Sequence, residues 1–152
     1  MSSEFLQDDP GASAVVPAAP RRGLWGHFVY CMKNYANGKG RASRAEYWSF
    51  VLFEVLFLFA AIIIDVIVTL AVYGAQTNSH FLPIFTCLAI FGFLLPNLTV
   101  LIRRLHDVGM SGWFLLLEFV PYVGGLFALV ISLIPGQAEP NKYGPGPGRT
   151  LP

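Results

Sequence analysis

Long apolar stretches separated by short polar segments are the dominant pattern of this chain. Three stretches, residues 48–73, 81–102 and 112–134, consist almost entirely of apolar side chains. A helix needs about 20 apolar residues to cross the roughly 30 Å hydrocarbon core of a bilayer, and each stretch is long enough. Three buried helices of a soluble protein would leave almost no polar sequence to cover them. The pattern therefore predicts an all-α protein, a small polytopic bundle of three transmembrane helices.

The ends of these stretches carry residues that begin or interrupt helices. Ser43 and Glu46 form a capping box before the first stretch, in which the hydroxyl accepts a backbone N–H and the glutamate reaches back. Pro83 suits the first turn of the second helix, where a missing N–H costs little. Pro96 lies inside that helix and should kink it, and Ser111 can cap the third. We therefore expect the first helix to begin before the membrane.

The third stretch allows two topologies. Pro121 and the pair Gly124 and Gly125 lie midway along it, so the segment is either a kinked single crossing or a re-entrant hairpin that returns to the side from which it came. Non-helical backbone inside the bilayer must be buried in protein, and this small chain offers little cover. We therefore favour the kinked crossing.

An amphipathic segment precedes the first stretch. Between residues 23 and 36, apolar side chains recur at helical spacing and polar ones face away. With Arg21 and Arg22 at its head, this pattern is typical of a helix on the inner membrane surface; docking on the protein's own cytoplasmic loop is the alternative, and both can hold. Residues 1–20 are expected to be a disordered leader, residues 21–147 the membrane domain, and residues 148–152 a tail.

The composition agrees with a membrane protein and limits its partners. The 152 residues are 55% hydrophobic and 12% charged, with a formal net charge of +1, whereas a soluble domain carries about 25% charged residues. So small a net charge predicts no attraction to nucleic acid. The cysteines Cys31 and Cys87 form no metal-binding spacing, and no phosphate-binding loop or hydrolase motif occurs. We therefore expect neither a metal nor a cofactor.

The distribution of basic residues predicts the orientation. Six of the ten bases precede the first stretch, the connection at residues 74–80 has none, and the next connection begins with Arg103 and Arg104. Basic residues collect in cytoplasmic loops, so the N-terminus and the loop at residues 103–113 are expected in the cytoplasm. Three crossings would place the tail outside, whereas a hairpin would bring it inside, and the sequence leaves both open.

Three polar motifs interrupt the apolar background. Residues 40–48 read GRASRAEYW, residues 103–113 read RRLHDVGMSGW, and residues 135–145 contain PG followed by PNKYGP. In order and spacing they resemble the bacterial inner-membrane family catalogued as domain of unknown function 805, the YhaH-like proteins. The resemblance covers residues 25–147 and implies an integral cytoplasmic-membrane protein, with no established activity and no catalytic residue to carry over. The chain departs from the family pattern at Gly146, where an acid usually stands, and at Glu118, a position that is normally apolar.

The few charges near the apolar stretches define candidate sites. Glu54 and Glu118 each lie six residues inside a stretch, about 9 Å from the cytoplasmic face at 1.5 Å per residue. An unpaired carboxylate in hydrocarbon costs a few kcal/mol, so each should pair with an arginine, be protonated or line water. We expect an inner-leaflet cluster with the arginines that end the second stretch. Its expected members are Glu54, Arg103, Arg104, His106, Asp107 and Glu118.

Two further groups of candidates lie outside this cluster. Asp65 lies deeper, with no base nearby, and is the candidate for an intramembrane protonatable or ion-contacting group. A bundle held together by polar contacts is the alternative role for all these charges. The residues expected to contact lipid or a partner at the cytoplasmic rim are Arg41, Arg44, Trp48 and Trp113.

These features support three functions, in decreasing order. The first is a non-catalytic accessory, scaffold or envelope-stress component of the cytoplasmic membrane, whose rim of arginines, Arg103 and Arg104 included, binds membrane lipids or a membrane-protein partner. The second is a small transporter or channel subunit, a homo-oligomer because three helices cannot enclose a polar path, with Asp65 and Glu54 on that path. The third is a lipid-headgroup enzyme that uses His106 and Asp107, although adjacent residues of a helix do not face each other.

Overall fold

The computed structural model describes residues 22–74 and 83–146 of the chain. In order, these residues form α1 (Leu24–Lys33), α2 (Arg44–Tyr73), α3 (Ile84–Asp107), the 3₁₀ helix η1 (Gly112–Phe119) and α4 (Val123–Leu133). These ranges contain no strand, only an isolated bridge between Asn141 and Gly144. The all-α prediction is confirmed. The expected leader (1–20), most of the first connection (75–80) and the tail (148–152) lie outside the described residues.

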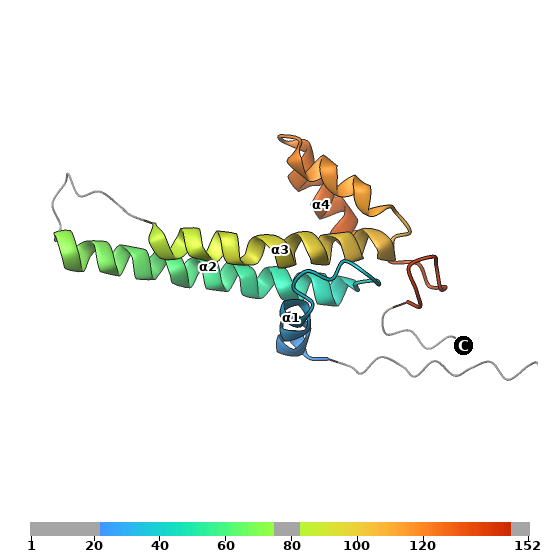
Figure 1. The fold of residues 1–152 in the computed structure, drawn as a ribbon, viewed down its shortest axis with the longest axis horizontal. Coiled ribbons are helices and arrows are strands. Elements are labelled where there is room, and N and C mark those ends of the chain that lie inside the picture. Colours follow the sequence, from blue (N-terminus) through green and yellow to red (C-terminus); the bar gives the residue numbers. More distant parts are fainter. Residues whose placement is uncertain (1–21, 75–82, 147–152) are drawn as a thin grey trace, which may run out of the picture.

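Helices α2 and α3 lie side by side and run in opposite directions (Figure 1). Both are long and apolar enough to cross a membrane. The 30 residues of α2 extend about 45 Å at 1.5 Å per residue, which exceeds the roughly 30 Å hydrocarbon core. The surplus lies at the end where α2 begins and α3 ends, because α2 starts ahead of the apolar stretch and α3 continues beyond it to Asp107. We call this end of the pair the basal end.

The predicted caps form, with one difference. The Ser43 hydroxyl accepts a hydrogen bond from the backbone N–H of Glu46 (3.1 Å), and Ser111 caps η1 through the N–H of Trp113 (3.5 Å). The Glu46 carboxylate does not reach back to the start of its own helix, because it pairs with Arg103 of α3 (2.6 Å). Helix α3 continues through Pro96, which is buried.

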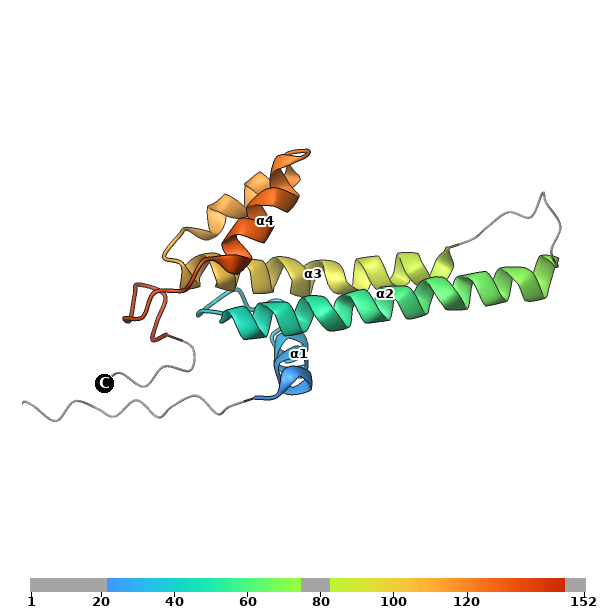
Figure 2. The same cartoon turned by 180° about the vertical axis from the view of Figure 1, so that it is seen from behind.

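Helix α1 lies crosswise against the α2–α3 pair (Figures 1 and 2). The buried Phe28 ring anchors it, with ring centroids 5.1 Å from Phe53 and 5.6 Å from Phe57 of α2 and 6.3 Å from Phe93 of α3. Trp25, one turn earlier, remains 57% exposed. Helix α1 therefore docks on the protein and also presents an aromatic side chain outward.

The third apolar stretch is a hairpin and not a single crossing. Its first arm is η1, and its second arm is α4, whose 11 residues extend only about 16 Å. The arms lie against each other, and the hairpin projects from the α2–α3 pair on the side away from α1 (Figures 1 and 2). The N–H of Gln137, just after α4, donates to the Asp107 carbonyl at the end of α3 (2.9 Å). Both ends of the hairpin therefore lie at the basal end, and the favoured kinked crossing is wrong.

A close backbone contact joins the two arms of the hairpin. Gly124 packs so closely on the backbone of Glu118 that a Cβ at this position would overlap it. The N–H of Gly124 donates to the Val120 carbonyl (2.9 Å), and the N–H of Val120 donates to the Leu117 carbonyl (3.1 Å). Two backbone N–H groups at the reversal are thus satisfied inside the hairpin, which lowers the cost of a chain reversal in an apolar environment.

Candidate functional site

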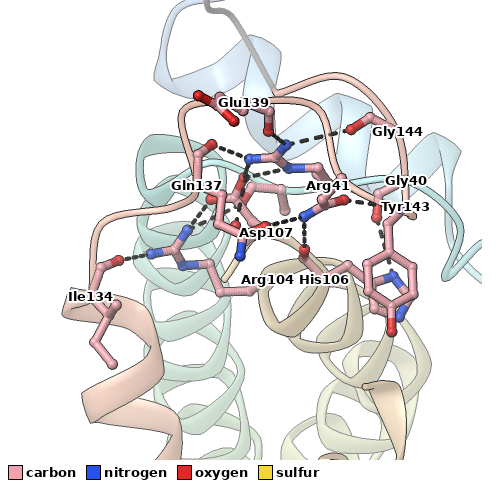
Figure 3. A network of polar contacts seen from close by, with 12 residues as sticks. Gly40, Arg41, Arg104, His106, Asp107, Ile134, Gln137, Glu139, Tyr143 and Gly144 are labelled. Carbon is pink, nitrogen blue, oxygen red and sulfur yellow. Dashed lines mark hydrogen bonds and ion pairs between the residues drawn. The ribbon is translucent and has the colours of Figure 1, made fainter. Parts of the chain in front are cut away.

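The basal end of the helix pair contains two arginines on either side of one aspartate (Figure 3). Arg41, which precedes α2, approaches Asp107 Oδ1 with Nη2 at 2.9 Å and Nε at 3.0 Å. Arg104 of α3 pairs through Nη1 with the other carboxylate oxygen, Oδ2. All three side chains are buried. We call Arg41, Arg104 and Asp107 the basal cluster.

Backbone carbonyls occupy the remaining donors of the two arginines. Arg41 donates to Glu139 O (2.8 Å), Gly144 O (3.4 Å) and Gln137 O, all in the segment that follows α4. Arg104 Nη2 donates to Ile134 O, and its Nε donates to Ile131 O (3.2 Å). These last two carbonyls belong to the end of α4, where a cation is favourable because the final carbonyls of a helix lack intrahelical partners. The basal cluster thus fastens the hairpin and the following segment to the helix pair.

The segment 135–146 folds over the cluster through its own side chains. Asn141 Nδ2 donates to the carbonyl of His106 (2.9 Å). The Tyr143 ring stacks on the His106 ring at 3.7 Å and 7° (Figure 3), and His106 Nδ1 lies 3.2 Å from Gly40 O. At Gly136 a Cβ would overlap the Asp107 carboxylate, so only glycine fits there. The three polar motifs of the sequence therefore meet at one place.

A second ion pair lies beside the cluster. Arg103 Nη1 pairs with Glu46 Oε1 at 2.6 Å, and the Cys31 thiol of α1 lies 3.6 Å from both partners. Burial raises the pKa of the Cys31 thiol to about 12, and the neighbouring Glu46 carboxylate adds to this increase while Arg103 opposes it. Cys31 therefore remains a protonated, unreactive thiol that ties α1 to the pair.

Glu54 and Asp65, the two acids of α2 beyond Glu46, are satisfied without a base. Asn97 Nδ2 of α3 donates to both carboxylate oxygens of Glu54, at 2.9 and 2.8 Å. Asp65, 1% exposed, accepts from the N–H groups of Phe85 (2.9 Å) and Thr86 (2.8 Å) and from the Thr86 hydroxyl (2.7 Å). These groups stand in the first turn of α3, whose orphan N–H donors favour an acidic partner. Asp65 thus joins the far ends of the two long helices.

The predicted inner-leaflet cluster forms only in part. The structure joins Arg104 and Asp107 and places His106 beside them, as expected. Arg103 pairs with Glu46, whereas Glu54 contacts Asn97, so the predicted pairing of Glu54 with an arginine is wrong. Glu118 lies on η1, and its Oε2 has no hydrogen-bond partner among the described residues. The carboxylates that the arginines require come from the polar motifs and not from the apolar stretches.

The predicted rim also changes. Arg41, Arg103 and Arg104 are buried and hold internal partners, so they do not form a basic surface, and that expectation is wrong. Arg44 is exposed and makes one long contact, to Leu133 O (3.4 Å). Trp48 is exposed on α2, and Trp113 is 79% exposed at the start of η1. Of the predicted rim residues, only Arg44, Trp48 and Trp113 are available to lipid or to a partner.

Sequence reasoning missed the residues that complete the site: Glu46, Asn97, Gln137, Asn141 and Tyr143. Asn141 and Tyr143 belong to the PNKYGP motif, which was the available signal, and Gln137 lies between this motif and the preceding PG. These three residues make their contacts through backbone carbonyls and a ring stack, which the pattern of charged residues in a sequence does not predict. Within residues 22–74 and 83–146, no group of three or more His, Cys, Asp or Glu side chains is arranged to hold a metal ion.

Comparison with known proteins relates the chain to bacterial membrane proteins. A family model described as "Protein of unknown function (DUF805)" matches residues 35–145. The chain is 34% identical over 122 residues to the inner membrane protein YhaH of Escherichia coli K12, a match that covers 79% of the chain and 94% of the relative. It is 38% identical over 120 residues to the inner membrane protein YhaI of the same organism, covering 79% and 93%. No solved structure matches the chain.

Proposed function

We propose that this chain, which belongs to the DUF805 family of inner membrane proteins, is a non-catalytic accessory protein that acts by binding other proteins within the bilayer. One observation carries the proposal. The buried charges of the basal cluster all have internal partners, and so do Glu54 and Asp65 of α2. An acid–base catalyst or an ion path needs a group that is free to exchange protons or ligands, and these groups are engaged in holding the fold together.

The outward surface of the helix pair supports a binding role. Where the structure describes α2 and α3, most of their outward side chains are apolar. The most exposed of these are Phe59, Ile67 and Val72 on α2 and Leu88 and Phe91 on α3. Such faces suit acyl chains and other membrane helices equally, and their aromatic side chains offer the large contact area on which protein interfaces depend.

The proposal includes a topology. Helices α2 and α3 cross the membrane, the hairpin of η1 and α4 dips into one leaflet, and both the N-terminal part and the segment after α4 lie in the cytoplasm. The basal end carries the bases Lys33, Lys39, Arg44 and Lys142, whereas the connection between α2 and α3 has no Lys or Arg, which follows the rule that basic residues stay inside. An arm of about 16 Å reaches only about half of a 30 Å hydrocarbon core.

The transporter alternative loses its candidate residues under this proposal. Asp65 serves as an acceptor for the first turn of α3, and Glu54 is held by Asn97. Purified protein in proteoliposomes with a trapped pH-sensitive dye is therefore expected to carry no proton flux above protein-free vesicles. A flux that Asp65→Asn abolishes would establish the transporter in place of the accessory role.

Site-specific photocross-linking tests the accessory role. Benzoylphenylalanine replaces Phe91, which is 71% exposed on α3, or Phe59 on α2, and the fully buried Phe50 is the matched control. Irradiation of living cells should attach a second protein, or a second copy of the chain, at one of the outward positions and not at Phe50. Lipid adducts alone at both outward positions would contradict a protein-binding role.

A further inference from the structure

A pocket of about 450 Å³ lies at the basal end, between the end of α3, the start of η1 and the segment that folds over the basal cluster. Its lining residues are His106, Ser111, Gly112, Trp113, Leu115, Leu116 and Tyr143. The volume falls within the roughly 300–1,000 Å³ of small-ligand sites. The basal cluster does not use this pocket, and none of its lining residues is acidic.

The two walls of the pocket differ in polarity. Trp113, Leu115 and Leu116 form an apolar wall that continues onto the outward face of the hairpin, where Trp113 and Leu116 are exposed. His106, Ser111 and Tyr143 supply polar atoms on the other wall. An exposed tryptophan beside an apolar hairpin is typical of headgroup depth in a bilayer. The pocket therefore has the amphipathic form of a phospholipid at the membrane surface.

The tautomer of His106 determines what the polar wall can bind. His106 Nδ1 lies 3.2 Å from the carbonyl oxygen of Gly40, and a carbonyl only accepts, so Nδ1 carries the proton. Nε2 of the neutral ring is then a hydrogen-bond acceptor. It lies on the Gly112 side, where a Cβ would approach it to 3.3 Å. Glycine at this position keeps the acceptor accessible.

An acceptor nitrogen beside aromatic rings favours a donor-bearing cation. The ammonium group can donate to His106 Nε2 and lie against the ring of Trp113, and aromatic faces attract cations. Lys142 Nζ lies 5.0 Å from the Tyr143 ring centroid, so a second cation stands at the edge of the pocket. That charge disfavours a bare ammonium ion and favours a ligand that carries a phosphate next to its ammonium.

We propose that the pocket formed by His106, Gly112, Trp113 and Tyr143 binds the phosphoethanolamine headgroup of a phospholipid. The ammonium group donates to His106 Nε2 and contacts Trp113, the phosphate faces Lys142, and the acyl chains follow the outward face of the hairpin. The site rests on the proposed insertion of the hairpin into one leaflet. It does not depend on a protein partner.

Native mass spectrometry of the full chain in mild detergent tests the site. The protein is mixed with equimolar phosphatidylethanolamine, phosphatidylcholine and phosphatidylglycerol that have identical acyl chains. Phosphatidylcholine has the same net charge but no N–H donor, so one hydrogen bond to His106 predicts about a 5-fold preference for phosphatidylethanolamine. Equal retention of the two, or stronger retention of phosphatidylglycerol, would overturn the assignment.

Two variants with matched controls localise the preference. Trp113→Leu should lower the retention of phosphatidylethanolamine and phosphatidylcholine alike, by about 2-fold to 5-fold relative to phosphatidylglycerol, the range for an exposed cation–aromatic contact, whereas Trp25→Leu, at an exposed tryptophan on α1, should leave the retention of all three unchanged. Gly112→Ala should remove most of the preference because the methyl group lies against His106 Nε2. Gly92→Ala, where the added methyl group meets nothing within 4 Å, is its control.

The controls decide the interpretation. Equal losses in a variant and in its control would place the lipid elsewhere and overturn the assignment. Losses in Trp113→Leu and Gly112→Ala that their controls do not show, in a protein that cross-links to no partner, would leave the headgroup site standing and contradict the accessory role alone. The two proposals therefore fail separately.

Discussion

Replacing Asp107 by asparagine is the sharpest perturbation of the basal cluster. The carboxylate accepts from Arg41 at 2.9 and 3.0 Å and also pairs with Arg104. Asparagine has nearly the same shape but no charge, and its NH₂ group would face donors. The substitution therefore leaves two buried guanidinium groups without an anion while changing the packing very little.

The expected loss follows from the burial of the partners. The side chains of Arg41 and Asp107 are 1% and 4% exposed, and removing one partner of such a pair costs about 3–5 kcal/mol. The carbonyls of Gln137, Glu139 and Ile134 still accept from the two arginines, so we expect the lower end, about 3 kcal/mol. This is a large fraction of the 5–15 kcal/mol by which proteins of this size are typically stable.

Tryptic cleavage after Lys142 measures this loss in the folded protein. Lys142 lies in the turn that the Asn141–Gly144 bridge closes, so cleavage requires the segment to open. When opening is fast, the rate follows the open population, and about 3 kcal/mol corresponds to a roughly 100-fold faster cut. Glu139→Gln is the control, because only the backbone carbonyl of Glu139 contacts the cluster. Cleavage of Asp107→Asn at the wild-type rate would refute the role of the ion pairs in holding this segment.

Three further predictions concern the hairpin, the thiol and the far end of the pair. Gly124→Ala should open the hairpin and lower the melting temperature, because its Cβ would overlap the Glu118 backbone. Gly125→Ala, whose added methyl group meets open space, should leave the melting temperature unchanged. Equal melting temperatures of the two variants would contradict the close packing of Gly124 on Glu118. With a pKa of about 12, only about 1 part in 10,000 of the Cys31 thiol is ionised at pH 8. In a Cys87→Ser background, N-ethylmaleimide should therefore label Cys31 only after unfolding. Labelling of the folded protein would disprove the burial of Cys31. Asp65→Ala should cost about 0.5–2 kcal/mol in chemical unfolding, as the loss of a helix cap does, and an unchanged midpoint would show that the α3 contacts contribute nothing.

Sequence patterns predicted the elements of this protein well, because apolar length and capping residues act locally. Ser43 begins α2 as its motif indicates. Residues 48–73 and 84–102 of the first two predicted stretches are the apolar parts of the two long helices. The resemblance inferred from the three polar motifs is confirmed by the family match over residues 35–145. Periodicity and capping chemistry need no knowledge of tertiary contacts, so they can be read from a single chain.

The reversal inside the third stretch could not be decided in the same way. Pro121, Gly124 and Gly125 signalled an interruption, but a kink and a reversal share these residues. What distinguishes them is the packing of Gly124 on the Glu118 backbone, which is a contact between two arms and not a property of either. The cost of a reversal in the bilayer was assessed for a chain without internal partners, whereas the N–H groups of Val120 and Gly124 find acceptors within the hairpin.

The partners of the buried charges were mispredicted for a related reason. Depth in the membrane suggested that Glu54 and Glu118 would pair with Arg103 and Arg104. Arg104 instead has its partner Asp107 three residues along the same helix, and most of its other contacts are carbonyls of α4 and the residue after it. Contacts with backbone carbonyls cannot be predicted from the positions of charged side chains. The Asn97 amide donates to the Glu54 carboxylate, and an uncharged amide is not identified as a partner when only charges are paired.

Cysteine accessibility at Glu139 tests the central claim most directly. In a Cys87→Ser background, single variants Glu139→Cys, Lys33→Cys and Tyr73→Cys are treated with a membrane-impermeant maleimide in intact spheroplasts and after permeabilisation. A re-entrant hairpin at the cytoplasmic face predicts that Glu139→Cys and Lys33→Cys react only after permeabilisation, while Tyr73→Cys, at the far end of α2, reacts in intact spheroplasts. Reaction of Glu139→Cys in intact spheroplasts together with Tyr73→Cys would mean that the third stretch crosses the membrane, and it would contradict the account.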